Sequence, residues 1–431
     1  MGPLSLVVAA GCGVTKDLGV LDTEGSEESG TGDTMEPMDS ATSMGEGDDS
    51  DTGIDLPPAS PSGAVDILFV VDNSGSMGGK QGLLAGSFFE LTEPLMQAGI
   101  QFRVAVTTSD NSNPWCPGTT PEGGYLVLSS CQSRLDEFVF SGSTMTDASQ
   151  EACLDVCALP SLDIAPTTTH VDPTAFPRPW VEWNSPEDLN TPGLAPSAVL
   201  SCALPTGING CGFEQPLESM YRALNRAQNA ADPSFGFLRP DANLLVVFVT
   251  DEADCSYNPA QETIFLPEDE RTFWSYPEDP TPTSAVCWNA GVQCSGVSPF
   301  DTCEPADLAP DGSPALTGDE ASLWPVSRYA GLLGGIAATK TAGRVAVMAF
   351  VGTQGNGSIV YSDTTDEGFQ GDFGIGPGCD VDGTQAVPPV RLRAVANAVN
   401  GGQDEGLFSV CGGSYGPALT AMAETIIGWA D

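Results

Sequence analysis

The stretch Ala64-Val-Asp-Ile-Leu-Phe-Val-Val-Asp-Asn-Ser-Gly-Ser76 decides the fold, because a nearly continuous apolar run leads directly into a polar, glycine-containing turn. Such a run is typical of a strand buried on both faces, as in a parallel sheet. Residues 80–97 follow with leucines and a phenylalanine at helical spacing, and residues 101–108 form a second apolar run. The order of strand, helix and strand predicts the repeating unit of a parallel α/β sheet.

The same alternation returns later in the chain. It predicts a doubly wound, mostly parallel α/β sheet with helices on both faces, formed by a single domain over residues 64–431. The further helices are expected over 213–230, 321–339, 390–399 and 417–429, and the further strands over 243–250, 344–351 and 407–411.

Two long segments, at about 109–200 and 252–318, interrupt this pattern and hold most of the cysteines and many prolines. Neither carries an apolar run long enough for a core of its own, so both are predicted to be disulfide-stapled loops. They leave from strand ends where α/β proteins bind ligands, and should shape a recognition surface. Trp180 and Trp183 form either a contact patch or a small core within the first insertion.

The chain has 13 cysteines, and all but Cys12 fall into blocks with even numbers. This pattern predicts disulfides within each block and an oxidising compartment outside the cytoplasm. A thiolate metal site at Cys153 and Cys157 is the alternative, but no second pair stands at zinc-finger spacing. The blocks are Cys116, Cys131, Cys153, Cys157, Cys202 and Cys211, then Cys255, Cys287, Cys294 and Cys303, then Cys379 and Cys411.

The N-terminal residues 1–12 end in Ala9, Ala10, Gly11 and Cys12, which resembles the lipobox of a bacterial lipoprotein signal peptide, although a basic n-region is missing. By this resemblance Cys12 carries the lipid, and the lipid is the only membrane contact. Residues 13–63 are rich in Ser, Gly, Thr and carboxylates, and predict a disordered acidic linker. The expected location is the outer membrane or the cell surface.

Charge and histidine content exclude several kinds of function. With 58 Asp and Glu against 14 Lys and Arg, the formal net charge is −44, which would repel nucleic acid. A single histidine, His170, rules out sites that need two imidazoles.

Hydroxyl and carboxylate side chains gather at two predicted strand ends. Asp72, Ser74 and Ser76 follow the first strand, and the strand over 243–250 ends in Thr250 and is followed by Asp251. Oxygen ligands of this kind suit a hard divalent cation such as Mg²⁺, Mn²⁺ or Ca²⁺. The alternative is that the Asp-Asn-Ser-Gly-Ser segment serves only as a turn and helix cap.

These motifs resemble the von Willebrand factor A (VWA) domain and its metal-ion-dependent adhesion site. The resemblance covers about half of the chain. It implies that Ser74 and Ser76 ligate the cation directly, that Asp72 and Asp251 do so directly or through water, and that an acidic group of a protein or glycan takes an open position. It also implies a last helix that slides when ligand binds.

One family feature is missing, because the segment before the helix over 213–230 has no threonine where the family supplies a ligand. Thr206, a few residues upstream, is the candidate replacement; water, Glu214 or a backbone carbonyl are the alternatives. Glu252 and Asp254 are expected to be solvated loop charges, and Arg391 and Arg393 to lie on a solvent-facing side of a helix.

A rival motif, Gly412-Gly-Ser-Tyr-Gly416, fits the Gly-x-Ser-x-Gly pattern of α/β-hydrolases. No histidine follows Ser414, and His170 precedes it, so we expect no enzyme activity and assign Ser414 to capping the last helix. The expected function is therefore that of a VWA-type lipoprotein in adhesion. The alternative is a structural envelope protein with a vestigial metal site, whose insertions mediate assembly.

Overall fold

The computed structural model describes residues 62–141, 145–269, 271–402 and 406–430. Cys12 and residues 13–61 of the predicted linker lie outside these ranges, so the predictions for them are not addressed by the structure. Within the described ranges, no helix is long and apolar enough to cross a membrane.

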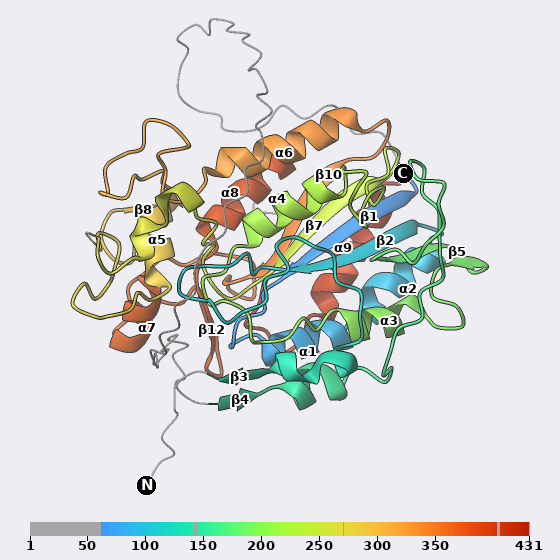
Figure 1. Ribbon diagram of the computed structural model, residues 1–431, viewed down its shortest axis with the longest axis horizontal. Coiled ribbons are helices and arrows are strands. Elements are labelled where there is room, and N and C mark those ends of the chain that lie inside the picture. Colours follow the sequence, from blue (N-terminus) through green and yellow to red (C-terminus); the bar gives the residue numbers. More distant parts are fainter. Residues whose placement is uncertain (1–61, 142–144, 270, 403–405, 431) are drawn as a thin grey trace, which may run out of the picture.

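A seven-stranded, mostly parallel sheet forms the centre of the molecule (Figure 1), in the order β13-β10-β7-β1-β2-β5-β6. The mixed α/β class predicted from the sequence is confirmed. The five parallel strands follow the predicted runs, and β5 and β6 are antiparallel additions at one edge. The bounds are β1 (Ala64–Val71), β2 (Gln101–Thr108), β5 (Val181–Ser185), β6 (Asp188–Leu189), β7 (Asn243–Val249), β10 (Val345–Val351) and β13 (Leu407–Ser409).

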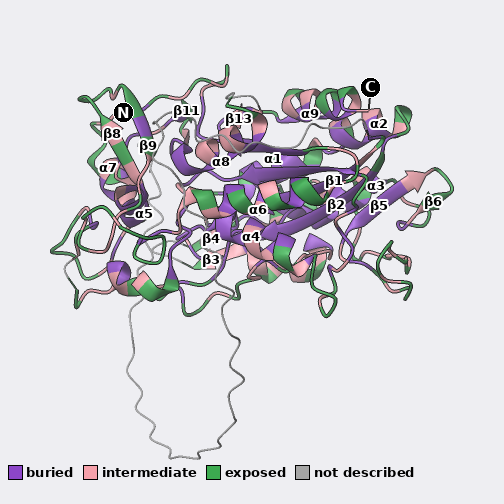
Figure 2. Cartoon of the chain, turned by 90° about the horizontal axis from the view of Figure 1, so that it is seen from above, coloured by how far each residue is buried: buried purple, intermediate pink, exposed green. Residues whose placement is uncertain are grey.

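Helices pack against both faces of the sheet, and Figure 2 shows the strands buried between them. The first face is covered by α1 (Gly78–Gly86), α2 (Phe89–Gln97), α3 (Pro196–Ala203) and α9 (Gly416–Gly428). The second face is covered by α4 (Pro216–Arg226), α6 (Val326–Thr339) and α8 (Val390–Asn400).

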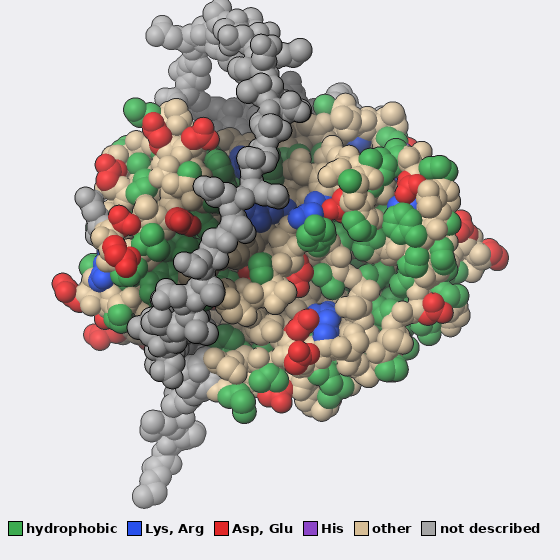
Figure 3. Space-filling view, in the orientation of Figure 1, with side chains coloured by type: hydrophobic (Ala, Val, Ile, Leu, Met, Phe, Trp, Pro, Cys, Tyr) green, Lys and Arg blue, Asp and Glu red, His purple; other side chains and the backbone are tan. Residues whose placement is uncertain are grey.

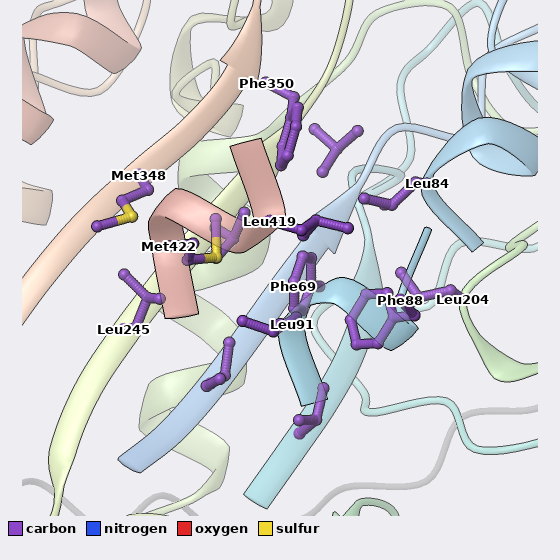
Figure 4. Close-up of a cluster of buried hydrophobic side chains, with 14 of the residues drawn as sticks. Phe69, Leu84, Phe88, Leu91, Leu204, Leu245, Met348, Phe350, Leu419 and Met422 are labelled. Carbon is purple, nitrogen blue, oxygen red and sulfur yellow. The ribbon is translucent and has the colours of Figure 1, made fainter. Parts of the chain in front are cut away.

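The central strand β1 explains why both faces are apolar. Ile67 and Phe69 point into the cluster below α2 and α9, whereas Leu68 and Val70 point into the cluster below α4 and α6, as the two-residue period of a strand requires. Figure 4 shows Phe69 among side chains of α1, α2 and α9, including Leu84, Leu91 and Leu419. Fully burying each such side chain stabilises the fold by about 1.5–3 kcal/mol.

The predicted single helix over 80–97 is wrong in one respect, because it is two helices separated at Ser87 and Phe88. Gly86, the last residue of α1, and Ser87 are poor helix formers, and the break follows directly after Gly86. The turn lets α2 pack along α9 while α1 stays at the carboxyl end of the sheet.

Six disulfides join cysteines of the same block in every case, which is the local pairing that the block pattern predicts. Cys153 and Cys157 lie within 4.8 Å of Cys131, but all three are oxidised and offer no thiolate to a metal. Disulfides of this number indicate an oxidising, extracytoplasmic environment.

The two insertions are stapled by disulfides, as predicted, and each also contributes to a small buried cluster that it shares with residues outside it. Phe265, Trp274 and Cys287 of the second insertion pack in one such cluster with Phe213, and Trp115 packs against it. Their short elements are η1 (Cys131–Phe138), β3 (Val139–Ser141), β4 (Met145–Asp147), η2 (Gln150–Leu154), η3 (Pro259–Phe265), α5 (Ala285–Gly291), β8 (Val292–Ser295) and β9 (Thr302–Pro305). After β10 come α7 (Glu367–Phe373), β11 (Cys379–Val381) and β12 (Thr384–Ala386).

Trp180 and Trp183 are neither a contact patch nor a core of the insertion. The first insertion returns to the sheet as β5, which places the two indoles in the apolar clusters on opposite faces of the sheet. Trp183 stacks on Phe102 of β2, and Trp180 tilts against Phe237. Sequence spacing did not reveal this, because the strand is short and far from its partner in the chain.

Candidate metal centre

The polar segments after β1 and β7 meet at the carboxyl end of the sheet. Val71 pairs with Val249 in register, and the Asp72 N–H donates to the Val249 carbonyl at 2.9 Å. The parallel pairing therefore brings Asp72 to Thr250 and Asp251 across 178 and 179 positions of sequence. The Asp-x-Ser-x-Ser turn and the Thr-Asp end of β7 form one local cluster.

Three oxygen ligands of the predicted set form a continuous row. The hydroxyl oxygens of Ser74 and Ser76 are 3.2 Å apart, and the Ser76 hydroxyl donates to Asp251 Oδ1 at 3.1 Å. Adjacent ligands of an octahedral Mg²⁺ stand about 3.0 Å apart when each metal–oxygen bond is about 2.1 Å long. The spacing of this row fits two edges of such an octahedron. Ser76 is exposed, so the row is open to solvent.

Asp72 lies behind this row and is fully buried. Its Oδ1 accepts the Ser74 N–H at 2.8 Å, and its Oδ2 accepts the Thr250 hydroxyl at 2.6 Å. Burial, and then the charge of Asp251, raise the pKa of Asp72 to about 6, although the Thr250 hydrogen bond opposes the shift. Asp72 thus orients the turn and adds negative charge beneath it.

Lys80 brings a positive charge to the same place. Its ammonium donates to Asp251 Oδ2 at 2.6 Å and to the Ser76 carbonyl at 3.1 Å, and only 8% of the residue is exposed. A cation in the first turn of α1 opposes the helix dipole, so Asp251 must offset this cost. Lys80 is not among the site residues predicted from the sequence; the available signal was a basic residue four positions after Ser76.

Two further buried carboxylates face Asp72. Burial and the charge of Asp72 raise the pKa of both Glu214 and Glu252 well above the usual range. Glu214 accepts the Ser109 hydroxyl through Oε2, and its Oε1 has no hydrogen-bond partner among the described residues. The prediction that Glu252 is a solvated loop charge is wrong, since it is only 5% exposed. Asp72 and Asp251 therefore have two further buried carboxylates near them, whereas the Lys80 ammonium contacts Asp251.

Asp254 is also buried rather than solvated, because it pairs with Arg391 at 2.9 Å. The prediction that Arg391 lies on a solvent face is wrong for the same reason. This pair is balanced and hydrogen-bonded, and it anchors α8 to the segment after β7. It contributes structure rather than a ligand position.

Thr206 lies near Asp72 but is not joined directly to the hydroxyl row. Its N–H donates to Gln81 Oε1 at 2.9 Å, and Gln81 Nε2 donates to the Asp72 carbonyl at 2.8 Å. The buried Thr206 hydroxyl has no partner in the described part of the chain. Among the described residues, the Thr206 hydroxyl and Glu214 Oε1 are therefore two buried oxygens without a hydrogen-bond partner.

The rival hydrolase residues lie at opposite ends of the molecule. Ser414 follows β13 at the carboxyl end, whereas the charges that act on His170 are those of Arg103, Asp66, Asp241 and Arg239 near the amino end. The predicted helix cap is also wrong, because the position before α9 is Tyr415 and no side chain caps that helix.

No family model and no curated protein match the chain. Among solved structures, it is similar to the pilus adhesin SpaC from Lactobacillus rhamnosus GG in an open conformation, at 12% identity and a TM-score of 0.32. That alignment covers 86% of this chain but 30% of SpaC. It is also similar to the adhesive tip pilin GBS104 from Group B Streptococcus agalactiae, at 11% identity and a TM-score of 0.28, covering 84% of this chain and all of that one. TM-scores this low carry no argument about function.

Proposed function

We propose that this protein is a doubly wound, VWA-like adhesion module that binds a divalent cation through Ser74, Ser76 and Asp251. The observation that carries the proposal is the row of three oxygens at 3.2 and 3.1 Å, open to solvent at Ser76 and backed by buried carboxylates. Asp72 orients the row, and Thr206 or Glu214 supplies a further oxygen.

The bound cation supplies a Lewis-acidic position for an acidic group of a partner. Ser74 and Ser76 are uncharged ligands. The positive charge of the cation is therefore only partly compensated by the protein. With Ser74, Ser76 and Asp251 holding the cation, a carboxylate of a partner would be the group that it attracts. The proposed setting is the outer membrane or cell surface, with Cys12 as the lipid attachment site and residues 13–63 as a linker.

Calorimetric titration of the full-length, chelator-treated protein with Mg²⁺, Mn²⁺ and Ca²⁺ tests the cation site. We expect saturable binding of at least one cation, and its loss in Asp72→Ala and Ser74→Ala. Ser414→Ala is the matched control, because it removes a hydroxyl from an exposed serine outside the cluster. Binding that persists in both site variants would refute the assignment.

A second candidate function is that of a structural envelope protein with a vestigial metal site. The Lys80 ammonium favours it, since this cation already contacts Asp251 and Ser76. In that case the insertions mediate assembly, and chelator leaves assembly unchanged. A chelator-sensitive interaction with a carboxylate-bearing partner would favour the adhesion module instead.

A further inference from the structure

A pocket of about 580 Å³ opens directly beside the hydroxyl row. Ser76 and Lys80 line it at the side of the candidate metal centre. Its other walls come from α1, the segment around η2, the β11–β12 hairpin and the loop before α9, and Figure 1 shows α1 and β12 as neighbours at this end of the sheet. A volume of this size falls in the usual range of ligand pockets.

Disulfides hold the walls of this pocket in place. Cys411 itself lines the pocket and is bonded to Cys379 at the start of β11. Val156 lies next to Cys157, which is bonded to Cys202 in α3. Two walls that come from distant parts of the chain are therefore fixed covalently before any ligand arrives, which lowers the entropic cost of binding.

The lining chemistry distinguishes between kinds of ligand. The apolar part of the wall is aliphatic, formed by Leu83, Val156, Val381 and Val410, and no aromatic side chain of the described residues lines the pocket. A sugar ring, with a hydroxyl group on most of its carbons, gains little from such a wall, whereas a branched aliphatic side chain gains burial. Figure 3 shows acidic side chains spread over one face of the molecule. The formal net charge of −44 disfavours ligands that carry several acidic groups.

We propose that the pocket binds the aliphatic side chain of a peptide ligand whose neighbouring acidic residue coordinates the cation at Ser76. The inference rests on the proposed cation site and specifies its ligand as a protein segment with an acidic residue next to an aliphatic one. Ser76 belongs both to the oxygen row and to the pocket wall, so adjacent ligand residues can reach the two places at once. Glu151 and Asp382, both exposed at the pocket, favour a neutral or basic flank.

The test uses capped tetrapeptides in which Asp is flanked by Leu on one side or the other, and a matched peptide in which Gly replaces Leu. Binding to the full-length protein is measured by calorimetry at saturating Mn²⁺. We expect one Leu peptide to bind about tenfold more tightly than the Gly peptide, because its leucine side chain is transferred from water into the aliphatic pocket. Equal affinities would overturn the inference.

A variant pair tests the pocket itself. Val381→Asp places a charge on the pocket wall, and Val171→Asp places the same charge on a valine that is likewise 45% exposed but lies in the first insertion. We expect Val381→Asp to abolish the tenfold preference for Leu, and Val171→Asp to retain it. A preference that survives in Val381→Asp would overturn the assignment to this pocket.

Two further outcomes are distinguishable. Mn²⁺-dependent binding of oligogalacturonate without any preference among the peptides would overturn the peptide inference in favour of an acidic glycan, and would leave the cation site standing. Failure of Mn²⁺ to bind in the absence of peptide would instead refute the proposed function, and the inference with it.

Discussion

Both ends of the central sheet carry buried carboxylates, but the charges are balanced at the amino end and not at the carboxyl end. At the amino end, Asp66 of β1 accepts from the Arg239 guanidinium and from the Arg239 N–H, each at 2.7 Å, and Arg239 also donates to the Val65 carbonyl. At the carboxyl end, Asp72 and Asp251 share their surroundings with Glu214, Glu252 and the single ammonium of Lys80.

This difference separates a structural ion pair from a candidate binding site. A buried charge is tolerated when a partner and hydrogen bonds satisfy it, as at Asp66. The carboxyl end has more carboxylates than nearby cations, and oxygens of Glu214 and Thr206 stay unpartnered within the described residues. Protons or a cation must neutralise the excess, and the exposed Ser76 opens it to solvent.

The largest expected effect is on the free energy of unfolding, and it comes from a substitution at the amino end of the sheet. Arg239→Met leaves the buried Asp66 carboxylate without its cation, so we expect the free energy of unfolding to fall by about 3–5 kcal/mol. Urea denaturation should give the same loss in chelator and in Mn²⁺, because this pair is far from the cation site. A loss that Mn²⁺ reverses would contradict the separation between the two ends.

The next effect concerns pH at the carboxyl end. The pKa of Asp72 is about 6 in the folded protein and near 3.8 when unfolded, so its ionisation destabilises the fold as pH rises from about 4 to 6. Asp72→Asn removes this penalty. In chelator we expect the stability of the variant relative to wild type to increase between pH 4 and pH 7, by on the order of 2 kcal/mol.

Urea denaturation of wild type and Asp72→Asn at several pH values measures this difference in stability. The contributions of the other carboxylates cancel, because both proteins contain them. Saturating Mn²⁺ should stabilise the wild type at pH 7 and not the variant. A constant difference across the pH range would show that Asp72 ionisation carries no such penalty.

The smallest expected effect is on cation affinity. Lys80→Met removes a positive charge that contacts Asp251, so Mn²⁺ should bind about tenfold more tightly by calorimetry. Lys340→Met is the matched control, because the Lys340 ammonium donates to the Arg239 and Ala242 carbonyls at the other end of the sheet. Unchanged Mn²⁺ affinity in Lys80→Met would show that its ammonium does not compete.

Some of the candidate site followed from the sequence because its residues are local to strand ends. Asp72, Ser74 and Ser76 lie within five positions, and Asp251 follows an apolar run that was recognisable as a strand. The burial of Glu252 and of Arg391 was not recognisable, because a charged residue in a loop or on a helix looks solvated until its partner is known. Arg391 meets Asp254 across 137 positions of sequence.

The sequence by itself determined the alternation of buried strands and helices, the block pattern of the cysteines and the excess of acidic residues, since each depends on residue type and short spacing. Only the tertiary structure decided that β5 completes the sheet edge, that Lys80 contacts Asp251, and that α1, the β11–β12 hairpin and the loop before α9 enclose a pocket. These contacts join segments far apart in the chain. Their energies depend on desolvation and geometry, which no local pattern encodes.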